Sequence, residues 1–412
     1  KGGLCTRTHP ARGDPRTAHA RPPDLAQCDD LRTGPRADYP KERGGADQGR
    51  GAGAQDRAAR ALSLRDRQEP EEGRRRVPAY YVRVLEDDVP LALDVISDIV
   101  LNSIFDPKEL EIERGVILQE IGQSLDTPDD IIFDWLQETA YPKQSMGRAI
   151  LGPAERVRSF SRMDLQSFVS EHYGPEQMVL AAAGAIDHEK LVQEAAAAFG
   201  NLKRTPKFIT ETSKFVGGET RVIKDLEQAH FALSLESANY LDDEIYTAQI
   251  YSTALGGGMS SRLFQEVREK RGLCYSIYAS AGAFADSGMM TIYSGTSSED
   301  ISDLANITID ELKRSADDIS EEEVARSRAQ MKAGMLMGLE GASARCERLA
   351  RTVSIFNRVP HLDEVISKID SVDATRVKKF AESLCISSPA LALYGPVSDA
   401  PNVGQLAKRL AG

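Results

Sequence analysis

Residues 389–395 read PALALYG, a short apolar run that ends at a glycine. Residues 178–184 read MVLAAAG and have the same form 211 positions earlier. Apolar runs of this length beside turn residues are typical of buried β-strands. Each run is followed by an amphipathic stretch that predicts a helix, over 188–199 in the first case and 403–410 in the second. The chain therefore contains two copies of one strand–helix unit.

Two further pairs of residues lie at nearly the same separation. Gly200 and Gly412 are 212 positions apart, and Asp164 and Asp373 are 209 apart. A repeat of about 210 residues is too long for a solenoid, whose units span roughly 20–50 residues. The pattern therefore predicts an α+β fold with two homologous domains. We place the remainder of the first domain at residues 79–204, a polar linker at 205–217 and the second domain at 218–412.

Hydrophobic periodicity and capping signals predict the remaining elements. Apolar residues recur at helical spacing from Val89 to Val100, and Pro107 suits the first turn of another helix. Ser320 and Glu323 form a capping-box pattern. The predicted elements are a strand over 80–85, helices over 89–100 and 107–124, a strand over 288–296, and helices over 300–314 and 320–339.

Residues 1–78 differ from the rest of the chain in composition. They hold 17 basic and 12 acidic residues, a net charge of +5, whereas the remainder has a net charge of −17. Fifteen of the basic residues are arginine, and only seven residues are large and apolar. So few apolar side chains cannot offset the cost of ordering the backbone, about 1–2 kcal/mol per residue. We expect this segment to be disordered or only loosely attached.

Three explanations of the segment remain open: a natural disordered arm, a transit peptide, and translation in a wrong reading frame that joins the correct frame near Ala79. A transit peptide contains few acidic residues, unlike this segment. Enrichment in arginine, glycine, alanine and proline with almost no lysine is what a GC-rich gene gives out of frame, and the abrupt change at Ala79 favours this explanation. The repeat starts the first domain near residue 7, so its opening strands fall inside the segment.

The composition of the whole chain argues against several classes of protein. A net charge of −12 disfavours a general nucleic-acid-binding protein. No apolar run approaches the roughly 18 residues of a membrane span, so we expect no membrane insertion. The five cysteines are scattered and never spaced as CxxC, which disfavours a disulfide framework and a cysteine zinc cluster. The first residues do not resemble an export signal, so we expect a bacterial cytoplasm, with an organelle matrix as the alternative.

Two pairs of side chains are candidates for chemistry. Glu113 and Glu120 lie seven residues apart, so both carboxylates share one face of the predicted helix over 107–124. Glu120 stands among apolar residues, where a partly buried carboxylate needs a cation or a metal ion, although two solvated glutamates are the simpler interpretation. Arg268 and Tyr275 could donate hydrogen bonds to a peptide carbonyl, or Arg268 forms a structural salt bridge.

The spacing of the histidines and glycines argues against two kinds of site. No two of the six histidines lie four residues apart, so the chain holds neither HExxH nor HxxEH. We expect His172 and His188 at the surface or at helix caps. The glycines at 256–258 lack phosphate-loop spacing, so nucleotide binding is not expected, and they indicate a close backbone approach or a flexible loop.

Three separated blocks occur in a fixed order along the chain. They are AYYVRVLEDDVPLALDVISDIVLNSIFDPKELEIERGVILQEIGQSLDTPDDIIFDWLQETAYP at 79–142, SMGRAILGP at 145–153 and LGGGMSSRLFQEVREKRGLCYSIYA at 255–279. Together these blocks resemble the pitrilysin/insulinase zinc metallopeptidases, in the branch of the mitochondrial processing peptidase and its bacterial relatives. The resemblance covers about residues 79–412.

This resemblance implies a fold and a set of roles. Two homologous α/β-sandwich domains, each an antiparallel-rich sheet covered by helices, form a clamshell half around an extended or unfolded peptide. An HxxEH motif supplies two zinc ligands and the general base. By position, Glu120 matches the distant zinc ligand and Glu113 the supporting acid. Arg268 and Tyr275 match the pair that holds the substrate backbone and polarises its carbonyl. A similar subunit, in a homodimer or heterodimer, is the implied partner.

The chain departs from the family pattern at the metal motif. The family spacing puts HxxEH about 77 residues before Glu120, where residues 41–45 read KERGG. A zinc site needs at least three protein ligands, so we expect that this chain does not bind the zinc of its family. We therefore predict that this chain belongs to a lineage of metalloendopeptidases that act on extended peptides. With the sequence it has, the chain itself is predicted to be inactive, because the HxxEH motif is absent. The alternative is a non-catalytic partner or scaffold subunit of a processing-peptidase-like complex.

Overall fold

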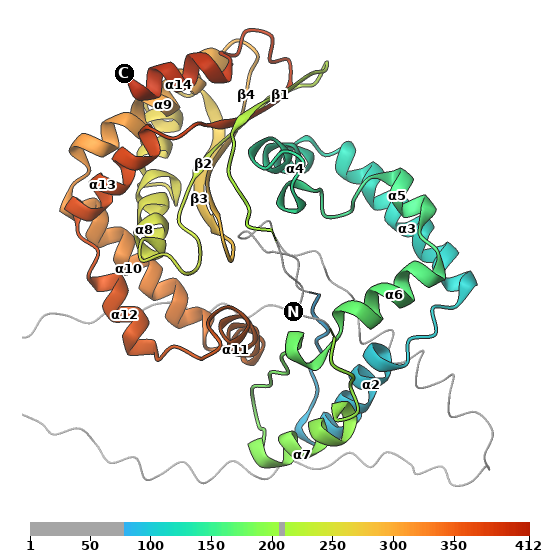
Figure 1. Ribbon diagram of the computed structural model, residues 1–412. Helices are drawn as coiled ribbons and strands as arrows, with labels where there is room; N and C mark the ends of the chain where they lie inside the picture. Colours follow the sequence, from blue (N-terminus) through green and yellow to red (C-terminus); the bar gives the residue numbers. More distant parts are fainter. Residues whose placement is uncertain (1–77, 206–210) are drawn as a thin grey trace, which may run out of the picture. The chain divides into compact units, whose positions relative to one another are not determined.

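The computed structural model describes residues 78–205 and 211–412, which form helices and one β-sheet (Figure 1). The prediction that residues 1–78 are disordered or only loosely attached falls, apart from Pro78, outside the described residues. In the first described stretch, the α-helices are α2 (Val89–Leu101), α3 (Pro107–Leu125), α4 (Pro128–Ala140), α5 (Ala154–Ser159), α6 (Arg162–His172) and α7 (His188–Phe199). Short 3-10 turns are η1 (Glu86–Asp88), η2 (Ser145–Gly147) and η3 (Pro175–Gln177).

The second described stretch combines strands and helices, so the predicted mixture of helix and sheet is confirmed. Its strands are β1 (Gly218–Ile223), β2 (Ala229–Glu236), β3 (Cys274–Ala283), β4 (Gly288–Thr296) and β5 (Ala390–Gly395). Its helices are α8 (Ile245–Gly256), the π-helix η4 (Phe264–Glu269), α9 (Ile301–Asp318), α10 (Glu321–Gly338), α11 (Ala342–Phe356), α12 (Leu362–Asp370), α13 (Ala374–Cys385) and α14 (Val403–Ala411).

The five strands form one sheet in the order β1-β5-β2-β4-β3. β1 and β5 run parallel and every other pair is antiparallel, which confirms an antiparallel-rich sheet. β2 lies in the middle, where Ala232 stands opposite Tyr293 of β4 on one side and Ala392 of β5 on the other. Within the described ranges, β3 ends the sheet and pairs with β4 alone.

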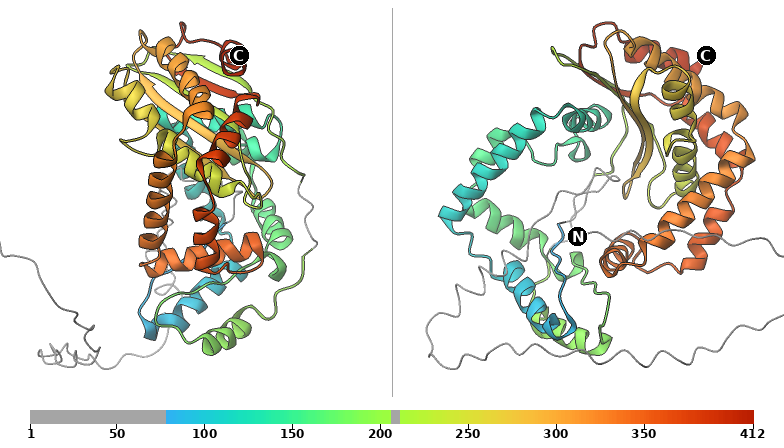
Figure 2. Two further views of the ribbon diagram at one scale, coloured as in Figure 1. Left: turned by 90° about the vertical axis from the view of Figure 1, so that its left-hand side faces the viewer. Right: turned by 180° about the vertical axis from the view of Figure 1, so that it is seen from behind.

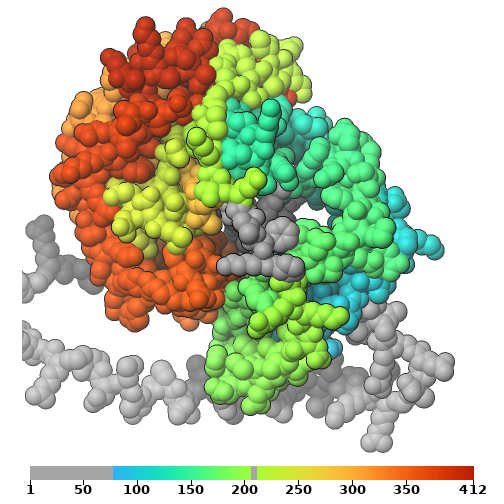
Figure 3. Space-filling model, viewed as in Figure 1, coloured from blue at the N-terminus to red at the C-terminus, as the bar shows by residue number. Residues whose placement is uncertain are grey.

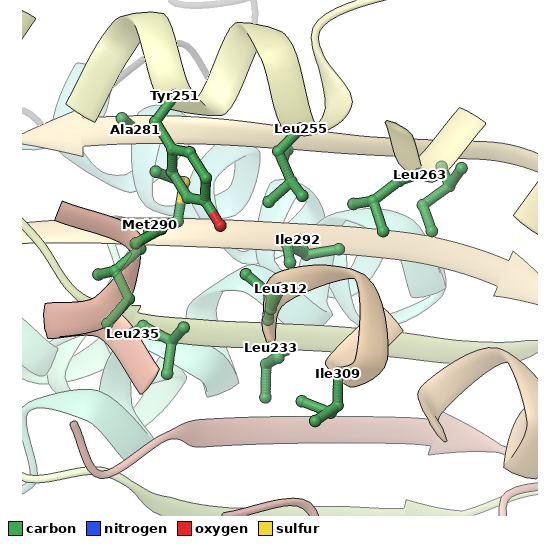
Figure 4. Close-up of a cluster of buried hydrophobic side chains, with 14 of the residues drawn as sticks. Leu233, Leu235, Tyr251, Leu255, Leu263, Ala281, Met290, Ile292, Ile309 and Leu312 are labelled. Carbon is green, nitrogen blue, oxygen red and sulfur yellow. The ribbon is translucent and has the colours of Figure 1, made fainter. Parts of the chain in front are cut away.

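One face of the sheet is covered by α8 and α9, and α13 packs against both helices (Figures 1 and 2). The side chains of β2 alternate between the two faces, so Leu233 and Leu235 point into this layer. Figure 4 shows them together with Tyr251 and Leu255 of α8, all fully buried. The hydroxyl of Tyr251 lies 2.8 Å from that of Ser315, so its polar atom keeps a hydrogen bond inside the core.

The opposite face of the sheet is covered by α4, a helix from the first half of the chain (Figure 2). Ile132 and Leu136 of α4 are fully buried against the small side chains of Ala232 and Ala392. Alanines at these sheet positions let the helix backbone approach closely. Trp135 adds an edge-to-face contact with Tyr394 at 4.9 Å between ring centroids. The two halves of the chain therefore share one hydrophobic core.

The start of the sheet is joined to the end of the chain. Arg221 of β1 donates hydrogen bonds to the carbonyls of Val397 and Ala400, at 2.8 and 3.0 Å. Glu219 accepts a bond from the backbone N–H of Val403, the first residue of α14. Figure 3 shows this yellow-green segment lying against the red C-terminal segment.

The helices repeat at the predicted separation. α9 starts 212 residues after α2, and α13 starts 212 residues after α6. Gly184 and Gly395 both have positive φ, 132° and 104°, at equivalent positions. The pairing of Asp164 with Asp373 is wrong in detail, because Ser161 is the N-cap of α6 and Asp373 that of α13. These N-caps are 212 residues apart, like the helices that they begin.

The capping signals located the helices well. Asp106 is the N-cap of α3 and accepts hydrogen bonds from the backbone N–H groups of Lys108 and Glu109. The capping box of Ser320 and Glu323 is confirmed at the start of α10. The other predicted helices are confirmed as α2, α7, α9 and α14, and the strands over 288–296 and 389–395 as β4 and β5.

Two predicted strands are wrong in the structure. Residues 80–85 and 178–184 contain no strand, and Val179 and Leu180 are 40% and 44% exposed instead of buried. In the second half, the equivalent strands β4 and β5 both pair with β2, which lies between them. The same offset puts a counterpart of β2 near residues 17–24, outside the described residues. A strand requires a neighbour that accepts its backbone hydrogen bonds, and among the described residues neither run pairs with a strand.

None of the helices in the part of the chain that the structure describes is both long enough and apolar enough to cross a membrane.

Candidate functional site

The two candidate carboxylates of the first half lie on α3. Glu113 and Glu120 are spaced by nearly two turns, and both are exposed. The expectation that Glu120 is partly buried is wrong, because α3 has no buried residue and Val116 is itself exposed. Arg114 tethers this helix to the end of α5 by donating to the carbonyl of Phe160 at 2.8 Å.

The residues present do not fit a zinc site. Within residues 78–205 and 211–412, no three histidine, cysteine, aspartate or glutamate side chains lie close enough to hold a metal ion. In those same ranges neither Glu113 nor Glu120 has a hydrogen-bond or ion-pair partner. The whole sequence also lacks an HxxEH motif. An exposed carboxylate alone does not bind zinc at useful affinity, because structural and catalytic zinc sites use three or four protein ligands.

The second candidate pair is brought together by the structure. The guanidinium of Arg268, in η4, lies 5.6 Å from the centre of the Tyr275 ring at the start of β3. It also lies 4.6 Å from the ring of Phe264 and forms an ion pair with Glu269 at 3.0 Å. Tyr275 is 83% exposed. Contacts with the two rings fix the orientation of the guanidinium. The N–H groups that do not face Glu269 can then donate to a ligand.

Gly256, the last residue of α8, lies against β3. A Cβ on Gly256 would lie 2.3 Å from the backbone nitrogen of Ala279 in β3, so only glycine allows α8 to end against that strand. This confirms the predicted close backbone approach. Gly258 has open space around it and makes no such demand.

A network of ion pairs holds η4, the helix that carries Arg268. The buried carboxylate of Glu266 pairs with Lys270, Arg271 and Arg314 at 2.5, 2.9 and 3.3 Å. Hydrogen bonds from Lys270 and Arg271 lower the pKa of Glu266 to about 2. Close by, burial raises the pKa of the Glu311 carboxyl despite the neighbouring Arg314. One face of η4 is therefore fixed by ion pairs, which leaves Arg268 on the other side.

A second set of ion pairs holds the loop that leads into η4. Arg262 donates from Nε and Nη2 to both carboxylate oxygens of Glu323, at 2.7 and 2.9 Å. It also pairs with Asp318 at the end of α9. Burial alone would raise the pKa of Glu323, but hydrogen bonds from Arg262 and Ser320 lower it to about 2. This two-pronged geometry fixes the approach to η4.

A small cavity adjoins Tyr275 on the face of the sheet that α4 covers. Its volume is about 220 Å³, and the residues that line it are Asp129, Gln228, His230, Tyr275, Ser276, Tyr293 and Gly295. Nδ1 of His230 lies 2.9 Å from the hydroxyl of Tyr293, and both side chains are buried. Sequence reasoning missed this cavity, because its walls come from four separate segments. The available signal was a histidine at the start of a strand whose other residues are mostly apolar.

His172 and His188 are placed as expected. His172 ends α6 with Nδ1 2.9 Å from the carbonyl oxygen of Phe168, and its ring stacks on the Phe168 ring. His188 is the exposed first residue of α7.

Comparison with known proteins agrees with this architecture. Residues 74–154 match the family described as insulinase (peptidase family M16), and residues 159–331 match the peptidase M16 inactive domain. An uncharacterized zinc protease of Streptomyces coelicolor is 34% identical over 330 residues, which cover 78% of this chain and 72% of that protein. The uncharacterized zinc protease YmxG of Bacillus subtilis is 34% identical over 327 residues, or 78% of this chain and 79% of that protein.

Two eukaryotic proteins are also similar. The mouse mitochondrial-processing peptidase subunit beta is 32% identical over 345 residues, covering 80% of this chain and 70% of that subunit. A chain in the structure of complex III2 from Candida albicans with Inz-5 bound has the same fold, with a TM-score of 0.73 at 21% identity over 80% of this chain and 82% of that chain. The chain belongs to the insulinase (M16) peptidase family. Within that family it belongs to the branch of the mitochondrial processing peptidase.

Proposed function

We propose that this chain, with the sequence it has, binds extended peptides but does not hydrolyse them on its own. The observation that carries the proposal is the lack of a set of zinc ligands. The sequence has no HxxEH, and the described residues offer only the exposed Glu120 at the expected ligand position. Bound zinc would supply an activated water and a Lewis acid for the scissile carbonyl, and this chemistry requires several protein ligands.

The peptide-binding part of the proposal rests on the second half. Among the residues that the structure describes, β3 has no strand neighbour on its outer side, so its backbone groups there can pair with an extended peptide. Arg268 and Tyr275 stand at the beginning of that strand with an exposed ring and a directed guanidinium. In this role Arg268 donates to a peptide carbonyl, and the Tyr275 hydroxyl donates to the next polar group of the backbone.

The roles of the α3 carboxylates belong to the lineage rather than to this chain. In a relative with an intact motif, Glu120 would be the distant zinc ligand and Glu113 its supporting acid. Here both side chains are solvated, and we propose no function for them beyond helix solubility. The bacterial relatives favour a bacterial cytoplasm as the compartment, and the mouse relative keeps an organelle matrix as the alternative.

Elemental analysis and a cleavage assay on the same sample test the proposal. Purified protein should contain far less than one zinc ion per chain, and an unstructured fluorogenic peptide should stay intact with and without a chelator. Glu120→Gln is the matched variant, and we expect it to leave both readouts unchanged. Stoichiometric zinc that disappears in this variant, or cleavage that a chelator abolishes, would overturn the proposal.

A second function, as the silent subunit of a complex, is favoured by the name of the mouse relative, which is one subunit of a peptidase. The test is to read the gene across the codons for residues 1–80. An HxxEH motif in another frame indicates an ancestor that was active by itself and argues against the silent subunit. Absence of the motif in every frame supports the silent subunit, whose partner is then sought by co-purification.

A further inference from the structure

The short helix η4, which carries Arg268, is not an α-helix. Its backbone is π-helical from Phe264 to Glu269, and the N–H of Lys270 then donates to the carbonyl of Gln265, five residues earlier, at 3.0 Å. Such turns are rare, and they occur mostly as single turns, frequently at functional sites. Other contacts must therefore make this register more stable than the α-helical one.

One ion pair of η4 favours the π register over the α-helical one. Nη1 of Arg271 donates to the carboxylate of Glu266 at 2.9 Å and to the backbone carbonyl of the same residue at 2.7 Å. The two residues are five positions apart. In an α-helix, residues at this separation point about 140° away from each other, whereas a π-turn places them one above the other. The double contact of Arg271 therefore stabilises the wider turn.

A second ion pair on the same carboxylate does not distinguish the two registers. The ammonium of Lys270 lies 2.5 Å from Oε1 of Glu266, four residues earlier. Side chains four residues apart are neighbours on an α-helix as well. Lys270 and Arg271 are both cations on the surface, with exposed fractions of 60% and 44%. They form a matched pair in which only Arg271 bears on the register.

The Glu266 carboxylate is also held from below. Its side chain is 9% exposed and pairs with Arg314 of α9 at 3.3 Å. Arg314 in turn pairs with the buried Glu311 of the same helix at 2.8 Å. Glu266 therefore has a fixed position against α9, and Arg271 binds to a carboxylate that cannot follow it.

The register of η4 sets the position of Arg268 relative to β3. The N–H of Leu273 donates to the carbonyl of the fully buried Val267, six residues earlier, at 3.1 Å. The carbonyl of Leu273 accepts a hydrogen bond from Thr296 of β4, which fixes the start of β3 to the sheet. A change of one residue in the helical register would turn Arg268 by about 100°. Its guanidinium would then leave the ring of Tyr275, which it faces at 5.6 Å.

We propose that Arg271 is a positioning residue for the peptide. Its bond to Glu266 holds η4 in the π register, and this register keeps the guanidinium of Arg268 against the Tyr275 ring. The inference rests on the proposed function, because the peptide is the ligand of Arg268 and Tyr275. Arg271 acts through Arg268 and does not itself touch the peptide.

Two readouts separate the position of Arg268 from peptide binding. Fluorescence anisotropy of a labelled extended peptide gives the affinity. Fluorine NMR of protein that contains fluorotyrosine gives the position without any peptide. In these spectra Tyr275→Phe identifies the Tyr275 signal, and Arg268→Ala shows where this signal lies once the guanidinium is gone. The variants are Arg271→Gln, the matched control Lys270→Gln, and the double variant Arg271→Gln/Arg268→Ala.

Arg271→Gln should weaken peptide binding roughly fivefold and move the Tyr275 signal toward its position in Arg268→Ala. Lys270→Gln removes one charged donor from the same carboxylate, so it should lower the urea midpoint by a similar amount. It should nevertheless keep the affinity within about twofold of the native value. In the Arg268→Ala background, Arg271→Gln should cause no further loss of affinity. Circular dichroism checks folding, and Arg271→Lys, whose side chain is one bond shorter, replaces Arg271→Gln if that variant does not fold.

Three results would overturn the role of Arg271: equal affinities in Arg271→Gln and Lys270→Gln, a Tyr275 signal that Arg271→Gln leaves in place, or a further loss of affinity in the double variant. The last result would mean that Arg271 touches the peptide itself. If the native chain does not bind the peptide, the proposed function fails, and the Tyr275 signal alone decides the position of Arg268. Movement of that signal in Arg271→Gln but not in Lys270→Gln supports the positioning role, and any other pattern refutes it.

Discussion

The two halves of this chain descend from one pattern, yet among the residues that the structure describes only the second closes a core of its own around a sheet. Leu233 and Leu393 of β2 and β5 are completely buried between helices. The equivalent run of the first half, residues 178–184, forms no strand, and its Leu180 is 44% exposed. α4 is the exception, because it buries Ile132 and Leu136 on the sheet of the second half. Within residues 78–205 and 211–412, the repeated sequence thus gives equivalent helices in both halves and strands in the second half only.

The largest effect should separate the two halves directly. Leu233→Ala removes a fully buried side chain and leaves a cavity, so it should lower the free energy of unfolding by about 2–5 kcal/mol. Leu180→Ala, the same change at an exposed site of the first half, should cost less than about 0.5 kcal/mol. Urea unfolding followed by tryptophan fluorescence measures both, since Trp135 lies in the core that α4 shares with the sheet. Equal costs would show that the first half has a closed core as well.

An intermediate effect concerns the charged network beneath η4. Glu266→Gln should lower the free energy of unfolding by about 2 kcal/mol at pH 7, because the carboxylate receives several charged hydrogen bonds. The pKa of Glu266 is about 2 in the folded chain and about 4.3 when unfolded, so its stabilisation is present above the unfolded value. It should shrink as the pH falls below about 5 and vanish near pH 2. A difference between native and variant that stays constant from pH 7 to pH 3 would contradict this assignment.

The smallest effect on stability is expected at the candidate peptide site. Arg268→Ala should change the free energy of unfolding by no more than about 1 kcal/mol, since the lost contacts are cation–π pairs and one exposed ion pair. It should weaken the binding of an extended peptide roughly tenfold. Arg409→Ala, which breaks an exposed pair with Asp310, is the control. Equal binding by the two variants would remove Arg268 from the site.

Features that depend on nearby residues were predicted from the sequence, whereas features that depend on distant segments were not. The proline at the start of α3 and the capping box of Ser320 located helix ends, because a helix forms its hydrogen bonds between residues four apart. The run at 80–85 has an equally strong local pattern and is not a strand. The expectation that Glu120 is partly buried was also wrong. Its apolar neighbours in sequence, such as Val116, would be buried only if another element covered them.

The candidate site shows the same division. The pairing of Arg268 with Tyr275 could be predicted, since both lie in one block that resembles the peptidases of the family. The cavity could not be predicted, because Asp129 and His230 lie 101 residues apart and meet only when α4 packs on the sheet. No pattern within either segment refers to the other.

By itself, the sequence determined the family, the duplication, six of the helices and the lack of an HxxEH motif, since each depends on residues close together in the chain or on their identities alone. Tertiary structure decided which apolar runs became strands, that Glu120 faces solvent, and that a carboxylate from α4 joins a histidine and two tyrosines of the sheet. The physical reason is that strand hydrogen bonds, burial and the walls of a cavity are all shared between distant segments, so they exist only once those segments meet.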